Sequence, residues 1–126
     1  MPNSLFIRTG VAVVEIDRIR KISRNPKFLS KYFSADELRY IVKHVMSPSL
    51  IAENYCAKVA FAKAIGTGTR IVPPIDVTVL RDRLGCPFII TSGRAQMLTE
   101  RENYVYTVSV SHCKKYAVAN VILHKK

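Results

Sequence analysis

One stretch decides the fold of this chain: Ala57-Lys58-Val59-Ala60-Phe61-Ala62-Lys63-Ala64-Ile65-Gly66-Thr67-Gly68. Its alanines favour a helix, and its glycines favour a helix end, because the left-handed residue that follows a helix is most often glycine. Upstream, Ser47-Pro48 suits a helix start, since proline is tolerated in the first turn. We therefore predict a helix over residues 49–65 that ends at Gly66.

The two lysines of this stretch, Lys58 and Lys63, are five residues apart and so lie about 140° from each other around the helix axis. Gly66-Thr67-Gly68 adds backbone amides and a hydroxyl just past the helix end. Lysines, amides and a hydroxyl near one turn suit a phosphate group. The same pattern is also typical of surface lysines before a glycine cap, so these residues alone leave both interpretations open.

Strand and helix patterns flank this helix on both sides. Ser34-Ala35-Asp36-Glu37 has the spacing of a capping box, which predicts a helix start. Runs of β-branched residues, Pro73-Pro74 and a turn around Gly85 separate the other segments. We predict strands over 6–16, 75–80, 87–91, 104–111 and 116–123, helices over 17–24, 26–31 and 35–45, a hairpin turn over 81–85, and a short helix capped by Ser92 that runs to residue 102.

This order of elements predicts an α+β fold with antiparallel hairpins, and 126 residues predict one domain over residues 1–126. Hydrophobic content of 48% and charged content of 23% argue against disorder. No apolar run approaches the roughly 18 residues that span a membrane, and the N-terminus lacks the basic region of a signal peptide. The three cysteines have no paired spacing, which favours a reducing compartment. We expect a cytoplasmic protein.

The net charge of +11 is concentrated in one segment, because no acid occurs between Asp17 and Asp36. Such a surface attracts nucleic acids, anionic membranes, phosphate-rich ligands or acidic proteins, although it is also typical of a solvated face. Aromatic residues are not interleaved with the basic run, and no helix-turn-helix or zinc-finger pattern occurs, so we do not expect nucleic-acid binding. The basic residues are Arg18, Arg20, Lys21, Arg24, Lys27 and Lys31.

A second candidate site is Ser111-His112 at the end of a predicted strand. A histidine beside hydroxyls can contact phosphate or take a proton, but a lone histidine is more often structural. Adjacent strand residues point to opposite faces, which argues against a serine–histidine nucleophile. The histidines and cysteines also lack the spacing of a zinc site.

Separated segments of the chain are similar, in order, to those of the holo-acyl-carrier-protein synthase (4′-phosphopantetheinyl transferase) family. Gly10 to Arg18 resembles the family's Gly-x-Asp-Ile-x-Glu-x-x-Arg opening, and Tyr55 to Gly68 resembles its Lys-Glu-Ala helix and glycine turn. Val108 to His112 resembles its Val-Ser-Ile-Ser-His ending. Asp82 to Pro87 is similar to its Asp-x-x-Gly-Lys-Pro hairpin. The resemblance covers nearly the whole chain and implies a compact antiparallel sheet with helices packed on it.

The resemblance also implies a function in fatty acid biosynthesis, the transfer of 4′-phosphopantetheine from coenzyme A to a serine of an acyl carrier protein. It implies a homotrimer whose active sites lie between subunits, and it makes Lys58 the catalytic candidate. Coenzyme A would contact Lys58, Lys63, Gly66, Thr67, Ser111 and His112, and the acidic carrier protein would contact Arg18, Arg20, Lys21 and Arg24.

Two departures from the family pattern concern the magnesium that the family uses. Ala12 stands where the family has a metal-binding aspartate, and Val59 stands where it has a metal-binding glutamate. Mg²⁺ requires oxygen ligands, and neither side chain supplies one. Glu15, Asp17 and Glu53 lie at spacings that do not place them beside Ala12 or Val59.

Two further departures, Asn54 for arginine and Cys86 for lysine or arginine, remove positive charge. We therefore predict no metal-ligating residues in this chain and impaired or absent transfer. One alternative is an active transferase in which Lys58 and bound water assist attack by the carrier serine, while phosphates and a displaced acid hold the metal. The others are an inactive paralogue that binds carrier protein or coenzyme A, and a basic nucleic-acid-binding module.

Overall fold

The structure, a computed structural model, describes residues 6–66 and 71–126. The residues form two antiparallel sheets and five α-helices in the α+β order that the sequence predicts. The elements are β1 (Ile7–Glu15), α1 (Ile16–Ile22), α2 (Pro26–Tyr32), α3 (Ala35–Lys43), α4 (Pro48–Ile65), the 3₁₀ helix η2 (Pro74–Asp76), β2 (Val77–Arg81), β3 (Pro87–Thr91), α5 (Gly93–Arg101), β4 (Tyr104–His112) and β5 (Tyr116–Lys125).

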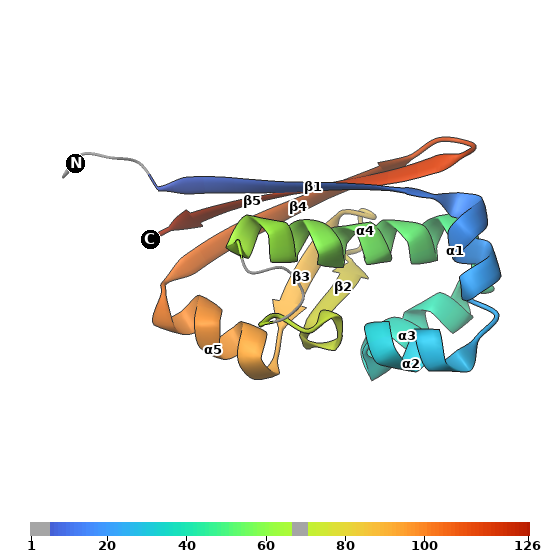
Figure 1. Cartoon of the computed structure of the whole chain (residues 1–126), viewed down its shortest axis with the longest axis horizontal. Helices are drawn as coiled ribbons and strands as arrows, with labels where there is room; N and C mark the ends of the chain where they lie inside the picture. Colours follow the sequence, from blue (N-terminus) through green and yellow to red (C-terminus); the bar gives the residue numbers. More distant parts are fainter. Residues whose placement is uncertain (1–5, 67–70) are drawn as a thin grey trace.

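The larger sheet has the strand order β1-β5-β4, so the first strand of the chain pairs with the last. Its register pairs Ala12 with Ala119 and Val110 with Ala119, which places these three residues on the same face. That face packs on α4, as Figure 1 shows, and the opposite face is free in the monomer. The smaller sheet is the β2–β3 hairpin on the other side of α4.

Helix α4 is the centre of the molecule. It is apolar on all sides, and such a helix is stable only when protein surrounds it. The three-stranded sheet covers one side of it, while β2, β3 and the shorter helices cover the other (Figure 1). Most of α4 is therefore buried, including residues such as Ala57, Ala60 and Phe61 that belong to the deciding stretch.

Gly10 allows β1 to lie directly against α4. A Cβ atom at this position would lie 1.9 Å from the carbonyl oxygen of Ala60, far inside any real contact distance. The absence of a side chain at Gly10 thus sets the distance between the sheet and the helix.

The helix ends confirm most of the predicted signals. Ser34 and Glu37 form both bonds of the capping box at the start of α3, and Gly66 ends α4 in the left-handed conformation with φ of 93°. Ser92 lies at the N-cap of α5 as predicted, but its side chain makes no capping bond. Asp76 caps this helix instead, because its Oδ2 accepts a hydrogen bond of 3.0 Å from the backbone N–H of Arg94.

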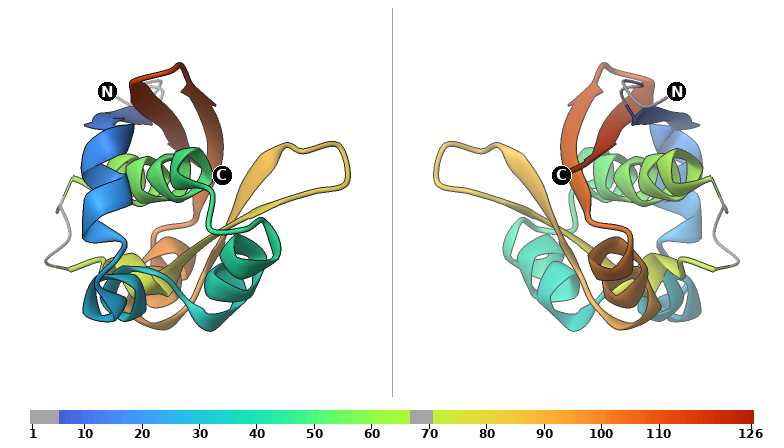
Figure 2. Two further views of the ribbon diagram at one scale, coloured as in Figure 1. Left: turned by 90° about the vertical axis from the view of Figure 1, so that its right-hand side faces the viewer. Right: turned by 90° about the vertical axis from the view of Figure 1, so that its left-hand side faces the viewer.

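One predicted strand begins later than expected. Residues 75 and 76 belong to η2, and β2 begins at Val77, because Pro73-Pro74 starts a 3₁₀ turn before the extended segment. The β2–β3 hairpin projects from the body of the molecule (Figure 2), with Leu84 89% exposed in its turn. Within the described residues, no helix has the length and apolar character needed to cross a membrane.

Candidate functional site

A pocket of about 260 Å³ opens between β1, α1, α2 and α4. Ala12 forms part of its wall from β1, and Val59 forms part of it from α4. The two positions that are far apart in sequence therefore meet at one cavity. Its lining comprises Ala12, Val13, Val14, Arg18, Ile19, Ile22, Phe28, Tyr55, Cys56, Val59 and Lys63.

The residues of this pocket do not fit a magnesium ion. Mg²⁺ binds through oxygen ligands in near-octahedral geometry, usually with one or two carboxylates. No carboxylate lines the pocket, and the two positions where a carboxylate would be expected are Ala12 and Val59. Within residues 6–66 and 71–126, no group of three or more His, Cys, Asp or Glu side chains is arranged to hold a metal ion.

The acids that follow Ala12 in the chain, Glu15 and Asp17, do not face the pocket. Glu15 pairs with Tyr116 across the sheet, on the face opposite to Ala12. Asp17 forms ion pairs with Arg20 and Lys21 on the exposed side of α1, at 2.7 Å and 3.3 Å. The structure therefore offers no displaced carboxylate from this part of the chain.

Glu53 is the third acid that could replace a lost metal ligand, and its carboxylate is also engaged by other side chains. It lies 3.2 Å from Nη2 of Arg81 and 2.9 Å from Nδ1 of His112. These contacts join α4 to β2 and to the end of β4. None of the three residues lines the pocket.

Lys63 lies at the pocket, on the exposed side of the last turn of α4. Its Nζ donates a hydrogen bond of 3.1 Å to the carbonyl oxygen of Val11, so it crosses from the helix to β1. Two residues further on, the end of α4 is fixed by Arg8, whose Nη1 donates to the carbonyl of Ile65 at 3.0 Å. Gly66 follows as the C-cap, and Thr67 lies outside the described residues.

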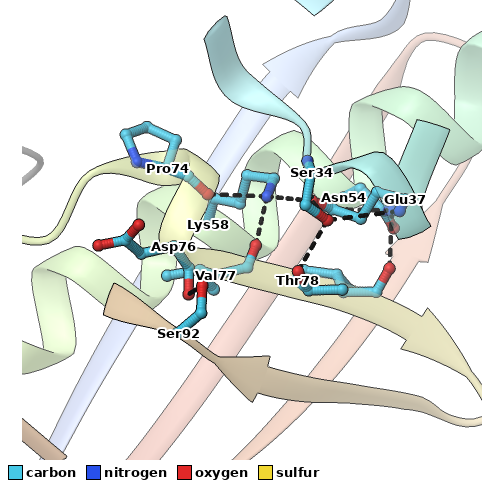
Figure 3. Close-up of polar contacts among 10 residues, drawn as sticks. Ser34, Glu37, Asn54, Lys58, Pro74, Asp76, Val77, Thr78 and Ser92 are labelled. Atoms are coloured by element: carbon cyan, nitrogen blue, oxygen red, sulfur yellow. Dashed lines mark hydrogen bonds and ion pairs between the residues drawn. The ribbon is translucent and has the colours of Figure 1, made fainter. Parts of the chain in front are cut away.

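Lys58 does not lie on the surface, although the sequence interpretation placed it against coenzyme A. Its side chain is 1% exposed, and its Nζ lies 2.5 Å from Oε1 of Glu37. The ammonium also donates to the carbonyl oxygens of Pro74, at 2.9 Å, and Val77. Figure 3 shows these partners converging on the lysine from α3, η2 and β2. Every donor of the ammonium has a partner inside the protein, so Lys58 presents no free donor to a ligand in this structure.

The surroundings of this ion pair are polar but closed to solvent. Nδ2 of Asn54 lies 3.4 Å from Oε2 of Glu37 and 3.1 Å from the carbonyl oxygen of Val79. Ser34 completes the shell on the Glu37 side through its backbone N–H, at 3.1 Å. Burial raises the pKa of Glu37 despite the attraction of Lys58, and burial lowers the pKa of Lys58.

Sequence reasoning missed this network, although part of the signal was visible. The sequence marks Glu37 only as a capping-box residue, yet the same carboxylate caps α3 and pairs with Lys58. Asn54 was noted only for replacing an arginine. No local pattern relates positions 37, 54 and 58, because α3 and α4 meet only in the folded chain.

Ser111 and His112 lie next to each other in β4 but point to opposite faces of the sheet, as strand alternation requires. His112 contacts Glu53 on the α4 side, while Ser111 lies on the free face. Of the coenzyme A candidates that the structure describes, Lys63 alone lines the pocket in a single chain.

The basic residues of α1 and the following turn form an exposed surface. Arg18 lines the pocket described above. Arg20 and Arg24 line a separate hollow with Met46, Pro48 and Ile51. Asp17 offsets part of this charge through Arg20 and Lys21. We call Arg18, Arg20, Lys21 and Arg24 the basic surface.

Comparison with known proteins identifies what this arrangement resembles. The family model for the 4′-phosphopantetheinyl transferase superfamily matches residues 8–121. A holo-acyl-carrier-protein synthase of Clostridium novyi is 38% identical over 121 residues, which cover 94% of this chain and 88% of that protein. One from Clostridium botulinum is 36% identical over 115 residues, covering 90% and 94% of the two chains.

Solved structures give the same result. The chain matches a holo-acyl-carrier-protein synthase of Bacillus anthracis in complex with CoA (3′,5′-ADP), with a TM-score of 0.81, 29% identity and coverage of 98% of this chain and 100% of that one. It also matches the Helicobacter pylori synthase in complex with coenzyme A, with a TM-score of 0.80, 25% identity and coverage of 91% and 98%. The predicted fold class is confirmed.

Proposed function

The chain belongs to the 4′-phosphopantetheinyl transferase superfamily, and we propose that it binds coenzyme A and an acyl carrier protein while its magnesium-dependent transfer is severely impaired. In this proposal it is a holo-acyl-carrier-protein synthase-like protein that keeps the fold of its relatives and lacks the two metal-binding carboxylates of the site. Cleavage of a pyrophosphate needs the developing charge to be offset, and a metal ion is the family's means of doing so.

One observation carries the proposal. Ala12 and Val59 line the same cavity as Lys63, and that cavity contains no carboxylate. Glu15 lies on the opposite face of the sheet, and Asp17 and Glu53 are each engaged by two basic side chains. The loss is therefore not repaired by a neighbouring side chain within the described part of one subunit.

Coenzyme A binding rests on the residues that remain. Lys63 presents an exposed ammonium at the end of α4, and its only described bond is to a backbone carbonyl, so a phosphate can replace that partner. The solved relatives from Bacillus anthracis and Helicobacter pylori contain coenzyme A or its 3′,5′-ADP part. In this proposal Lys63, Gly66, Thr67, Ser111 and His112 contact the cofactor.

Lys58 has a positioning function in this proposal. Its ammonium is bonded to Glu37 and to the carbonyls of Pro74 and Val77. These bonds hold Pro74 of η2 and Val77 of β2 against the middle of α4. A buried ammonium with three internal partners positions other groups and does not itself accept a proton from a substrate.

The carrier protein binds at the basic surface in this proposal. Arg18, Arg20, Lys21 and Arg24 lie on one short segment, three of them on α1, and acyl carrier proteins are acidic partners. Complementary charge of this kind speeds association and is weakened by salt.

The free face of the three-stranded sheet supports the homotrimer. Alternate residues of β1 and β5 on this face are apolar and exposed in the monomer: Ile7, Val11, Val13, Tyr116 and Ile122. An exposed apolar face of this kind is typical of a subunit interface. Residues such as Ser111, which lie on the same face, would then approach a neighbouring subunit.

The test is the intact mass of an apo acyl carrier protein after incubation with this protein, coenzyme A and Mg²⁺. We expect no mass shift, or a shift only at near-stoichiometric protein, while a holo-acyl-carrier-protein synthase with both carboxylates modifies the same carrier in parallel. Calorimetry should still detect coenzyme A binding, and EDTA should leave that binding unchanged. Complete modification at catalytic amounts of this protein would reject the proposal.

A further inference from the structure

The pocket that lacks carboxylates has its own chemistry, and the inference drawn from it rests on the proposed function in one respect, because Lys63 is also assigned there to coenzyme A. Its floor is apolar and closed, with Ile19 3% exposed and Phe28 8% exposed. Its rim is also apolar but open, with Ile22 41% exposed. Val59 continues the apolar wall from α4.

Two polarizable groups in the wall are uncharged. Burial raises the pKa of the Cys56 thiol to about 11, with Glu53 adding to the effect. Burial also raises the pKa of the Tyr55 phenol, which lies near Tyr32 and Arg18. At neutral pH both groups are protonated, so the wall carries no negative charge.

Among the described residues that line the pocket, the charged ones are both positive. Arg18 enters from α1 and Lys63 from α4. Among the described residues, no carboxylate forms an ion pair with either of them. An apolar cavity with unpaired cations and no acid is complementary to a small ligand with an apolar chain and one anionic group.

We infer that this pocket binds an amphiphilic anion, an acidic head group on a short alkyl chain, directly through Arg18 and Lys63 and without a divalent cation. The volume of about 260 Å³ lies just below the range of roughly 300–1,000 Å³ for ligand pockets, which favours a short chain. An alkyl carboxylate and an alkyl phosphate share this chemistry.

A homologous series tests the inference by NMR titration of the isotope-labelled full chain with EDTA present. Each methylene that enters the pocket should tighten binding about fourfold, so octanoate should bind roughly fifteenfold more tightly than hexanoate. Acetate and inorganic phosphate, which lack a chain, should bind at least about tenfold more weakly than octanoate or octyl phosphate. Nonanoate and octyl phosphate carry the same eight-carbon chain and differ in head group, so the tighter of the two shows whether the pocket prefers a carboxylate or a phosphate.

Three variants distinguish binding in this pocket from non-specific attraction to the basic surface of the protein. Lys63→Gln should weaken octanoate binding about threefold to fivefold, as expected for one exposed charge. Lys43→Gln, which removes an exposed lysine of α3 away from the pocket, should leave it unchanged. Val59→Glu, which places a carboxylate in the wall, should reduce binding more than about tenfold by like-charge repulsion.

Affinity that is independent of chain length, or that falls equally in Lys63→Gln and Lys43→Gln, would overturn the inference in favour of non-specific attraction to a basic protein. Binding that requires added Mg²⁺ would overturn it as well. Because the readout is ligand affinity, none of these outcomes depends on whether phosphopantetheine is transferred.

Discussion

Lys58 and Glu37 form an ion pair in the interior, between the central helix and the capping box of α3, with Nζ 2.5 Å from Oε1. Neither side chain is accessible to solvent beyond 1%. The centroid of the Phe33 ring, itself 1% exposed, lies 5.3 Å from the ammonium. Removing a single partner would leave the other charge buried and unpaired, which typically costs about 3–5 kcal/mol.

The single variants should have opposite dependence of stability on pH. In Lys58→Met, the folded-state pKa of Glu37 lies above its ordinary value of 4.5. The folded state then binds the proton more tightly, so the free energy of unfolding falls as pH rises above about 4.5. In Glu37→Gln, the folded-state pKa of Lys58 lies below its ordinary value of 10.5. The unfolded state then binds more protons, so the free energy of unfolding rises as pH increases toward 10.5.

Urea unfolding from pH 5 to pH 9, with the wild-type chain as reference, measures both slopes. The double variant Lys58→Met/Glu37→Gln contains no unpaired charge and should be more stable at pH 7 than either single variant. Two slopes of the same sign would show that the pair is not buried as described.

Gly10 should tolerate no larger residue. Gly10→Ala places a Cβ 1.9 Å from the carbonyl oxygen of Ala60, and β1 must move away from α4. We expect a loss of about 3 kcal/mol or more in the free energy of unfolding. Gly85→Ala is the matched control, since no atom lies within 4 Å of its Cβ, and its φ of 86° alone should cost about 1 kcal/mol. Equal losses at the two glycines would contradict the close approach of strand and helix.

Local signals predicted most of the fold because each of them depends on residues that are close together in the sequence. Ser34 and Glu37 marked the start of α3, and Gly66 marked the end of α4, since caps depend on residues within one turn. The cap of α5 was assigned to Ser92 and belongs in part to Asp76, 18 residues before Arg94. That contact forms only after η2 and α5 have come together, so no sequence spacing reveals it.

The three cysteines should differ in reactivity. Cys56 is 1% exposed and its thiol pKa is about 11, so a thiol reagent should not modify it in the folded protein. Cys86 and Cys113 are exposed. Backbone hydrogen bonds from Lys115 and then Tyr116 lower the pKa of Cys113, which favours its thiolate.

Mass spectrometry after brief alkylation at pH 7.5 should therefore find modification at Cys113 and Cys86, and none at Cys56 before denaturant is added. The variant Cys113→Ser should take up one label fewer. Rapid labelling of Cys56 under native conditions would mean that α4 is not packed as described.

The free sheet face should control assembly. Val11→Lys introduces a charge among exposed apolar residues of β1, and a trimer that buries this face should dissociate. Met97→Lys, at a 71% exposed position of α5, is the matched control and should not change the assembly. Analytical ultracentrifugation measures both. A wild-type chain that sediments as a monomer would contradict the trimer.

The candidate site was less predictable than the fold. The sequence led to Lys63, Ala12 and Val59, and the structure brings these three to one pocket. The resemblance assigned Lys58 to coenzyme A, and no sequence pattern reveals that its side chain is buried, since a lysine in a helix is exposed far more often than buried. The burial follows from Glu37, Pro74 and Val77, which reach the lysine from separate elements.

In the proposed function, Ala12 and Val59 separate this chain from an active transferase, and restoring both carboxylates tests this most directly. The variant Ala12→Asp/Val59→Glu should be compared with the wild-type chain by the intact mass of an apo acyl carrier protein incubated with coenzyme A and Mg²⁺. We predict that the double variant adds the phosphopantetheine group and that EDTA abolishes the addition, while the wild-type chain leaves the carrier mass unchanged. Equal modification by both proteins, or none by a folded double variant, would contradict the account.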